Sequence, residues 1–138
     1  MSMEQARKDL MTAVEAARAA WPGGALKLQT ENKNLVDRST QVDPYVAASI
    51  MFMGGEQASI GDKPLVATFG HLVLAFCTKE DQGTAGVYKM ADHFARYVEF
   101  KQFTAVRTRS MLPQKAVPNR GWYDVPVLVP FWYHRVAA

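Results

Sequence analysis

The side chains of this sequence that are best suited to chemistry are one cysteine and three histidines. A tetrahedral metal site needs three or four such ligands within reach of one ion. His71 and Cys77 share one side of an extended segment, but they stand six residues apart, which is about 20 Å along an extended chain. His93 and His134 lie farther along the chain, outside metal-ligand spacing. The spacing therefore predicts no metal site.

Catalysis by a thiol requires a base within hydrogen-bond distance and surroundings that lower the thiol pKa. No motif pairs Cys77 with His93, and we expect Cys77 to be a small core residue and His93 a solvated helix residue. Glu80 and Asp81 follow a predicted strand and are typical of a solvated turn. Segment 54–63 holds glycines and a lysine without the spacing of a phosphate-binding loop. The sequence therefore predicts neither an enzyme nor a bound cofactor.

The composition predicts one folded domain over residues 1–138. Hydrophobic residues make up 49% and charged residues 21% of the chain, which is enough apolar side chain for a sizeable core. The net charge is only +3 and the basic residues are scattered, so specific nucleic-acid recognition is not expected. No apolar stretch approaches the roughly 18 residues that span a bilayer, so we expect no membrane partner. A single cysteine and a charged N-terminus favour a soluble protein in a reducing cytoplasm.

Two segments carry apolar residues at the three- and four-residue steps of a helix that lies on a core. The first covers residues 2–20, and Ser2 with Gln5 forms the pattern of a capping box at its start. The second covers residues 84–100, with Thr84 as its expected N-cap. We expect both helices to pack on one sheet through five apolar side chains, Leu10, Val14, Ala17, Phe94 and Val98.

The other segments of regular pattern are strands, in which β-branched and aromatic residues alternate or cluster between glycine and polar runs. Gly70 lies inside one of them and predicts a bulge or a bend. Successive strands without crossovers favour a largely antiparallel sheet with helices on one face. This is the α+β class, in the order α-β-β-β-α-β-β. The expected strands are residues 26–30, 45–53, 65–77, 103–111 and 122–134, with polar loops at 31–43 and 54–63.

The last strand carries Pro126 and Pro130, which lie four residues apart and remove two N–H donors from the same edge. We therefore expect this strand at the margin of the sheet. Its less apolar face carries Trp132, which is either a scattered exposed residue or part of a subunit contact. Met51 and Met53, on one side of another strand, leave the same two interpretations open. The candidate subunit-contact residues are Trp132, Met51, Met53, Arg107 and Arg109.

Four features of the chain are together typical of one protein family. They are an opening helix that ends near Trp21-Pro22, before a loop through Asn32 and Asn34; Tyr45-Val46 at the start of a strand; residues 70–76 leading through 83–86 into 90–94; and the closing strand 122–131. In these features the chain resembles the small tail terminator, or tail completion, proteins of long-tailed phages, of the minor tail protein U type. The likeness spans nearly the whole chain and is one of pattern.

The resemblance implies a sheet flanked by helices and assembly with other copies of the chain into a ring, typically a hexamer. Such a ring caps the tail tube, ends its polymerisation and offers a surface for head joining. The implied partners are further copies of the chain, the tail tube protein and a head-completion protein. The implied location is the virion tail, assembled in the cytoplasm of the bacterial host. The family has no catalytic residues to carry over, and the long loop at 31–43 departs from its pattern.

Two other functions fit the same sequence. A different head–tail connector, or neck, protein would share this size but bind the portal side of the particle. A small α+β ligand-binding or enzyme domain would instead contain a deep pocket lined by converging polar groups. The loops at 31–43 and 54–63 are polar and long enough that we expect them to become ordered on meeting a neighbouring subunit.

Overall fold

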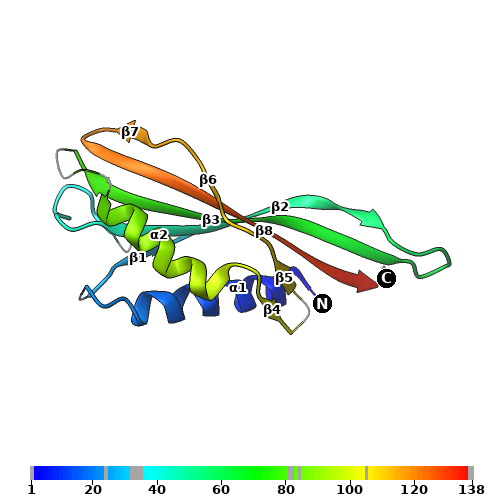
Figure 1. The fold of residues 1–138 in the computed structure, drawn as a ribbon. Coiled ribbons are helices and arrows are strands. Elements are labelled where there is room, and N and C mark those ends of the chain that lie inside the picture. The colour runs from blue at the N-terminus through cyan, green and yellow to red at the C-terminus, as the bar shows by residue number, and fades with distance from the viewer. Residues whose placement is uncertain are drawn as a thin grey trace.

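Two helices lie on the same side of a single curled sheet, as Figure 1 shows. In this computed structural model the sheet has eight strands, and every pairing except that of the first two strands is antiparallel. The α+β class predicted from the sequence is confirmed. The structure describes residues 2–23, 25–31, 36–80, 83, 85–104 and 106–136. Outside these ranges lie four residues that the sequence analysis singled out, Asn32, Asn34, Asp81 and the expected N-cap Thr84.

The first helix, α1 (Met3–Ala19), lies within the predicted segment and begins at the predicted cap. The Oγ of Ser2 accepts a hydrogen bond from the backbone N–H of Gln5 at 3.1 Å. The Gln5 side chain does not complete the capping box, because its amide donates to Asp9 Oδ1 at 3.0 Å instead. One half of the predicted capping box is therefore formed.

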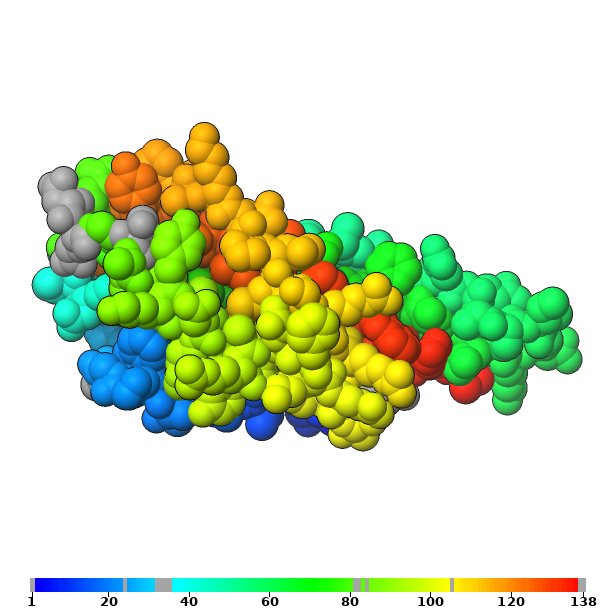
Figure 2. Space-filling view, in the orientation of Figure 1, coloured from blue at the N-terminus to red at the C-terminus, as the bar shows by residue number. Residues whose placement is uncertain are grey.

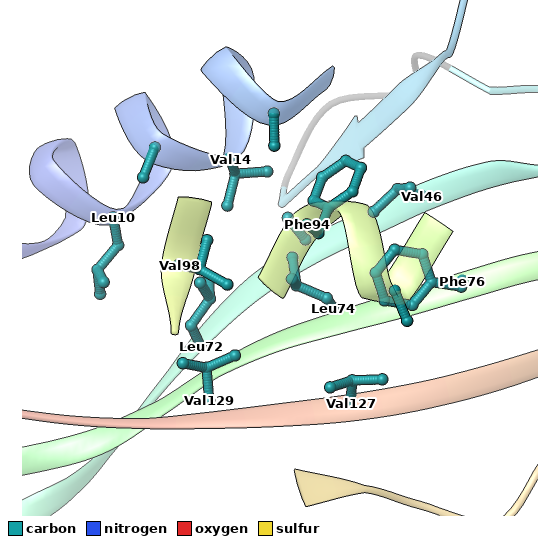
Figure 3. Close-up of a cluster of buried hydrophobic side chains, with 14 of the residues drawn as sticks. Leu10, Val14, Val46, Leu72, Leu74, Phe76, Phe94, Val98, Val127 and Val129 are labelled. Carbon is teal, nitrogen blue, oxygen red and sulfur yellow. The ribbon is translucent and has the colours of Figure 1, made fainter. Parts of the chain in front are cut away.

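The second helix, α2 (Ala85–Val98), ends two residues before its predicted end, because Phe100 turns the chain with a φ of 53°. All five side chains predicted to pack the helices on the sheet are buried. They meet apolar side chains that alternate along three strands of the sheet, and together these residues form the main core. Figure 3 labels ten members of this core, Leu10, Val14, Val46, Leu72, Leu74, Phe76, Phe94, Val98, Val127 and Val129.

The sheet is built around two long strands, β3 (Leu65–Lys79) and β8 (Trp122–Val136), which pair along their whole length. On the other side of β3 lies β2 (Tyr45–Gln57), followed by the short parallel strand β1 (Leu28–Thr30). Beyond β8 the chain contributes four short strands, β4 (Gln102–Phe103), β5 (Val106–Thr108), β6 (Leu112–Pro113) and β7 (Val117–Asn119).

The prediction that the last strand forms the margin of the sheet is wrong. β8 lies inside the sheet, between β3 and the short strands β5, β6 and β7. The carbonyls of Pro130 and Pro126 accept hydrogen bonds from the backbone N–H groups of Arg109 (2.9 Å) and Gln114 (2.8 Å) on the short-strand side. The nitrogen and carbonyl of an extended residue point to the same edge. The missing proline donors therefore face this edge, which is paired only in short pieces.

The prediction of a single strand over residues 103–111 is also wrong. β4 and β5 form a small antiparallel hairpin there, and Thr104 in its turn has a φ of 37°. The side chains of the segment nevertheless alternate between the two faces of the sheet, as expected of a strand. Val106 and Thr108 are buried, whereas Arg107 and Arg109 are exposed.

The hairpin of β2 and β3 projects well beyond the helices and forms the green extension of the molecule in Figures 1 and 2. The connector predicted at residues 54–63 is too long at its start, because β2 continues to Gln57, which pairs with Val66. Only residues 58–64 remain as the turn. We call residues 51–71 the arm and residues 58–64 its tip.

A β-bulge lies near the base of the arm, in the strand opposite Gly70. Gly70 pairs with Phe52, and the next pair along is Phe69 with Gly54, so Met53 is the extra residue. A Cβ atom at position 70 would lie 2.2 Å from the carbonyl oxygen of Met51. The predicted irregularity at Gly70 is thus a bulge in the partner strand, and the glycine permits the close approach of that strand.

Candidate functional site

The face of the sheet opposite the helices carries the candidate functional residues. Alternation sends every second residue of β2, β3 and β8 into the core and the residues between them to this other face. Towards the arm these outward side chains are large and apolar, and Met51, Met53 and Phe69 are exposed by 46%, 54% and 37%. We call this surface the open face and define it by nine residues, Met51, Met53, Phe69, His71, Arg107, Arg109, Pro130, Trp132 and His134.

The fold brings all five candidate subunit-contact residues together on the open face. Met53, Arg109 and Trp132 line one groove of about 520 Å³. Met51 lies beside it, directly across from His71 in the β2–β3 ladder. Arg107 pairs with Trp132 in the β5–β8 ladder, and its guanidinium lies 5.2 Å from the centre of the Trp132 ring. That these residues contact a neighbouring subunit stays a prediction.

The two arginines of the open face are exposed and available to a partner. Among the described residues, Arg107 and Arg109 form no ion pair. The Nδ1 atom of His71 is buried and has no hydrogen-bond partner within the described part of the chain. The ring of His134 lies edge-on to Trp132, with 5.3 Å between centroids. Aromatic, methionine and arginine side chains are the types enriched at the centre of protein–protein interfaces.

The same face of the sheet is covered at its other end, where segment 36–43 lies over a second, smaller core of Tyr45, Cys77 and Trp122. Arg38 fastens this segment. Its Nε donates to the Tyr45 hydroxyl at 2.6 Å, and a terminal nitrogen donates to Asp124 Oδ1 at 2.7 Å. The guanidinium also lies 5.4 Å from the Trp122 ring centre. Burial opposes the charge of Arg38, yet these partners raise its pKa above the ordinary value.

The covered end shows how a chain segment is held on this face of the sheet. One arginine stacked on an aromatic ring and paired with a carboxylate holds a chain segment on the sheet. The open end has the stacked arginine, Arg107 on Trp132, but its guanidinium has no carboxylate among the described residues. The open face is thus suited to a partner that supplies apolar contact and an acidic group.

Cys77 is a core residue, as predicted, and is 1% exposed. Burial, followed by the nearby charge of Asp124, raises the pKa of the Cys77 thiol from 9.0 to about 12. A thiol that stays protonated is not an activated nucleophile. Cys77 contacts Arg38, whereas His93 lies on α2, across the sheet, so the two do not form a catalytic pair.

We predict that Cys77 resists alkylation by iodoacetamide at pH 8 in the folded protein and reacts readily in urea. The thiol is buried and its raised pKa keeps it protonated. The pKa of the Cys77 thiol is higher in the folded than in the unfolded chain, so the protonated thiol favours folding. This contribution to the free energy of unfolding is complete below about pH 9 and is lost as the pH rises towards 12. Mass spectrometry of time points measures the labelling. Complete labelling of the native protein within minutes would contradict the structure.

We predict that Arg38→Met lowers the free energy of unfolding by about 2 kcal/mol, because it leaves the Asp124 carboxylate without its cation and the Tyr45 hydroxyl without its donor. The side chains of Arg38 and Asp124 keep 32% and 22% exposure, so the loss is smaller than for a fully buried pair. Urea denaturation measures the change. The control is Arg7→Met, which breaks a surface pair with Glu4 and should change stability little. Equal effects of both substitutions would refute the role of Arg38.

The expectation of a solvated His93 is wrong. His93 is partly buried, and its Nε2 lies 2.8 Å from the carbonyl oxygen of Ala17, so it links the two helices. Its ring also packs against those of Trp21 and Tyr97. The helical spacing did place His93 on the more polar side of α2, but it could not show that α1 ends beside it.

The described residues also bear on the requirements of a metal site and of a membrane-spanning helix. Among the residues that the structure describes, no group of three histidine, cysteine, aspartate or glutamate side chains is placed to hold a metal ion. No helix in the described ranges combines the length and apolar character needed to cross a membrane.

Sequence reasoning missed the roles of Arg38, Asp124 and Phe69. Arg38 lies in a polar loop and its partners come from two distant strands, so no spacing along the chain indicates the contact. Phe69 had a detectable signal, since it breaks the alternation of its strand with a large apolar residue on the outer side.

Comparison with known proteins adds evidence on the fold. No family model and no curated protein sequence matches this chain. Thirteen chains of solved structures match it. One of them aligns over 96% of this chain and 96% of its own length, with a TM-score of 0.67 and 15% sequence identity. Its name is a bare sequence identifier that states no function, and identity this low shows a shared fold alone.

Proposed function

We propose that this chain is a structural subunit of a phage or prophage tail, a tail terminator rather than an enzyme. Copies of it form a closed ring of six that caps the tail tube, ends its polymerisation and prepares it for joining to the head. Its partners are further copies of itself, the tail tube protein and a head-completion protein. It acts in the virion tail and is assembled in the cytoplasm of the bacterial host.

The observation that carries this proposal is the open face. Met51, Met53 and Phe69 keep more than a third of their surface exposed on one side of a sheet, beside a tryptophan stacked with an arginine. Large apolar patches of this kind mark interaction sites on soluble proteins. Together with the family pattern of the sequence, the open face supports contact between copies of the chain as the role of this surface.

The contact that we propose is heterologous, so that the open face of one copy meets a different surface of the next. Contacts of this type generate a ring when the rotation between copies closes. The Cys77 thiol, with a pKa raised to about 12, gives no support to nucleophilic catalysis. The groove on the open face has mostly apolar lining residues and supports docking better than small-molecule chemistry.

Deletion of the gene from its phage or prophage tests the terminator role. We expect overlong or headless tail tubes in electron micrographs of the deletion, and normal particles when the wild-type gene is restored. Tails of unchanged length that join heads normally would rule out the role. Tubes of normal length that fail only to join heads would instead indicate a neck protein.

A further inference from the structure

The tip of the arm presents one apolar side chain to solvent. Ile60 is 98% exposed, more than any other large hydrophobic residue among those described. The turn around it is fixed by hydrogen bonds, from Ala58 N to the Leu65 carbonyl at 2.6 Å and from Leu65 N to Ser59 Oγ at 2.7 Å. The turn that joins β2 and β3 lies at the far end of the projecting arm (Figure 1), so its residue Ile60 is held in solvent.

A groove of about 450 Å³ lies between α1 and the strands β1 and β2. Its apolar part is formed by Met11, Leu28 and Ile50, which are partly buried and pack on the main core. Charged side chains, among them Glu15, stand at its rim. The groove is thus an apolar recess with polar edges, and its size suits a bulky aliphatic side chain and the turn that carries it.

The edge of β2 beside this groove is only partly paired with strands among the described residues. β1 pairs with β2 only as far as Ala48. The next N–H on that edge, from Ile50, donates to the Glu31 carboxylate at 2.6 Å in place of a strand carbonyl. Beyond this point no strand among the described residues pairs with that edge of β2.

The tip cannot reach the groove of its own chain. Ile50 borders the groove, and Gln57 is the last residue of the same extended strand, directly before the tip. Seven residues of strand separate them by about 23 Å. The groove can receive the tip only from a second copy, in a contact between two different surfaces.

Both surfaces carry charges of both signs. Asp62 and Lys63 follow Ile60 in the tip and are exposed. The rim of the groove carries the cation Arg7 and the carboxylates Glu15 and Glu31. Within the subunit Arg7 already pairs with Glu4, Glu15 with Arg18, and Glu31 with the Ile50 N–H. A tip that places Ile60 in the recess would set Asp62 near Arg7 and Lys63 near a carboxylate, and would so extend these contacts between copies. Such pairs favour the correct register between copies.

We propose that the arm tip of each copy docks in the groove between α1 and β2 of the next copy, with Ile60 seated against Met11, Leu28 and Ile50. This inference rests on the proposed ring and assigns the neighbouring surface on which the arm of each copy ends. In this contact the projecting arm carries the Ile60 side chain across the boundary between subunits.

Cysteine cross-linking tests the contact. The variant with Ile60→Cys and Met11→Cys should form, on mild oxidation under assembly conditions, a ladder of disulfide-linked oligomers on non-reducing gels. The native Cys77 is buried and does not take part. The control pairs Ile60→Cys with Asp92→Cys on the exposed side of α2, and it should yield no ladder. A contact within one chain would leave only monomer.

Ring formation is measured in parallel by native mass spectrometry, so that the two proposals fail separately. Rings without the Ile60–Met11 ladder would overturn the docking of the tip and leave the ring intact. Failure of the wild-type chain to form rings, even with the tail tube protein present, would overturn both.

A charge at the tip gives an independent measurement. Ile60→Asp should weaken assembly at least 10-fold without changing the melting temperature, because the side chain touches nothing within its own subunit. The matched control is Val42→Asp, at an apolar position that is 59% exposed on segment 36–43. Assembly of Ile60→Asp equal to that of Val42→Asp would also overturn the proposal.

Discussion

Replacing Trp132 with alanine should abolish ring assembly at concentrations where the wild-type chain assembles. Trp132 lies at the centre of the open face, with Arg107 stacked on its ring and the groove beside it. A buried tryptophan at an interface contributes about 2 kcal/mol or more, which is a roughly 30-fold loss of affinity at each contact. Because a ring repeats the same contact between each pair of neighbours, this loss of affinity applies at every contact. Sedimentation velocity and native mass spectrometry measure it.

The matched control for Trp132 is Tyr88→Ala on α2. Tyr88 is an aromatic residue exposed by 46%, on the side of the molecule away from the open face. We expect this variant to assemble like the wild type. Both variants should keep the wild-type melting temperature within a few degrees, which separates assembly from folding. Normal rings formed by the Trp132 variant would remove the open face from the contact.

Replacing Gly70 with alanine should lower the free energy of unfolding by about 3 kcal/mol. The new Cβ would lie 2.2 Å from the carbonyl oxygen of Met51 and 3.0 Å from the Phe131 ring. The first of these atoms belongs to the backbone, so β2 must move away from β3 at the base of the arm. Urea denaturation measures the change, and hydrogen exchange should show weaker protection of the arm beyond Phe52.

Gly86→Ala provides the control for Gly70→Ala. Gly86 lies in the first turn of α2, and no atom stands within 4 Å of a Cβ built there. Alanine favours a helix over glycine, so we expect this variant to be more stable by about 0.5 to 1 kcal/mol. Opposite signs for the same substitution would confirm that the close approach of β2 decides the effect at position 70. A stable Gly70→Ala protein would contradict the register of the arm.

The helices and the core faces of the long strands could be predicted because their signals are local. The three- and four-residue spacing of Leu10, Val14 and Ala17 identifies the buried side of α1 without knowledge of what covers it. The alternation along the last strand likewise identifies the buried side of β8. Each of these patterns is complete within one segment of the chain.

The position of β8 in the sheet could not be predicted in this way. Pro126 and Pro130 do mark a weakened edge, but three short strands from residues 106–119 still pair along it between the prolines and beyond them. The pairing of Arg38 with Asp124 is similarly non-local, since 86 residues separate the two. Contacts between distant segments depend on how the whole sheet assembles, so the spacing of residues along the chain does not predict them.

The sequence indicates each candidate contact residue within its own segment, and the fold places these residues on one surface. Met51 and Met53 were notable for their shared side of a strand, and Trp132 for its place opposite an apolar row. Their proximity arises from the β2–β3 and β3–β8 registers, which bring three strands side by side. Residue type thus indicated the chemistry of the site, while topology determined its extent.

A cryo-electron microscopy reconstruction of the head-proximal end of the tail tests the central claim most directly. We predict a closed ring of six copies of this chain on the last ring of the tube, with Trp132 and its neighbours on the open face buried between copies. A tail end that lacks the chain, or a ring in which the open face remains in solvent, would contradict the account.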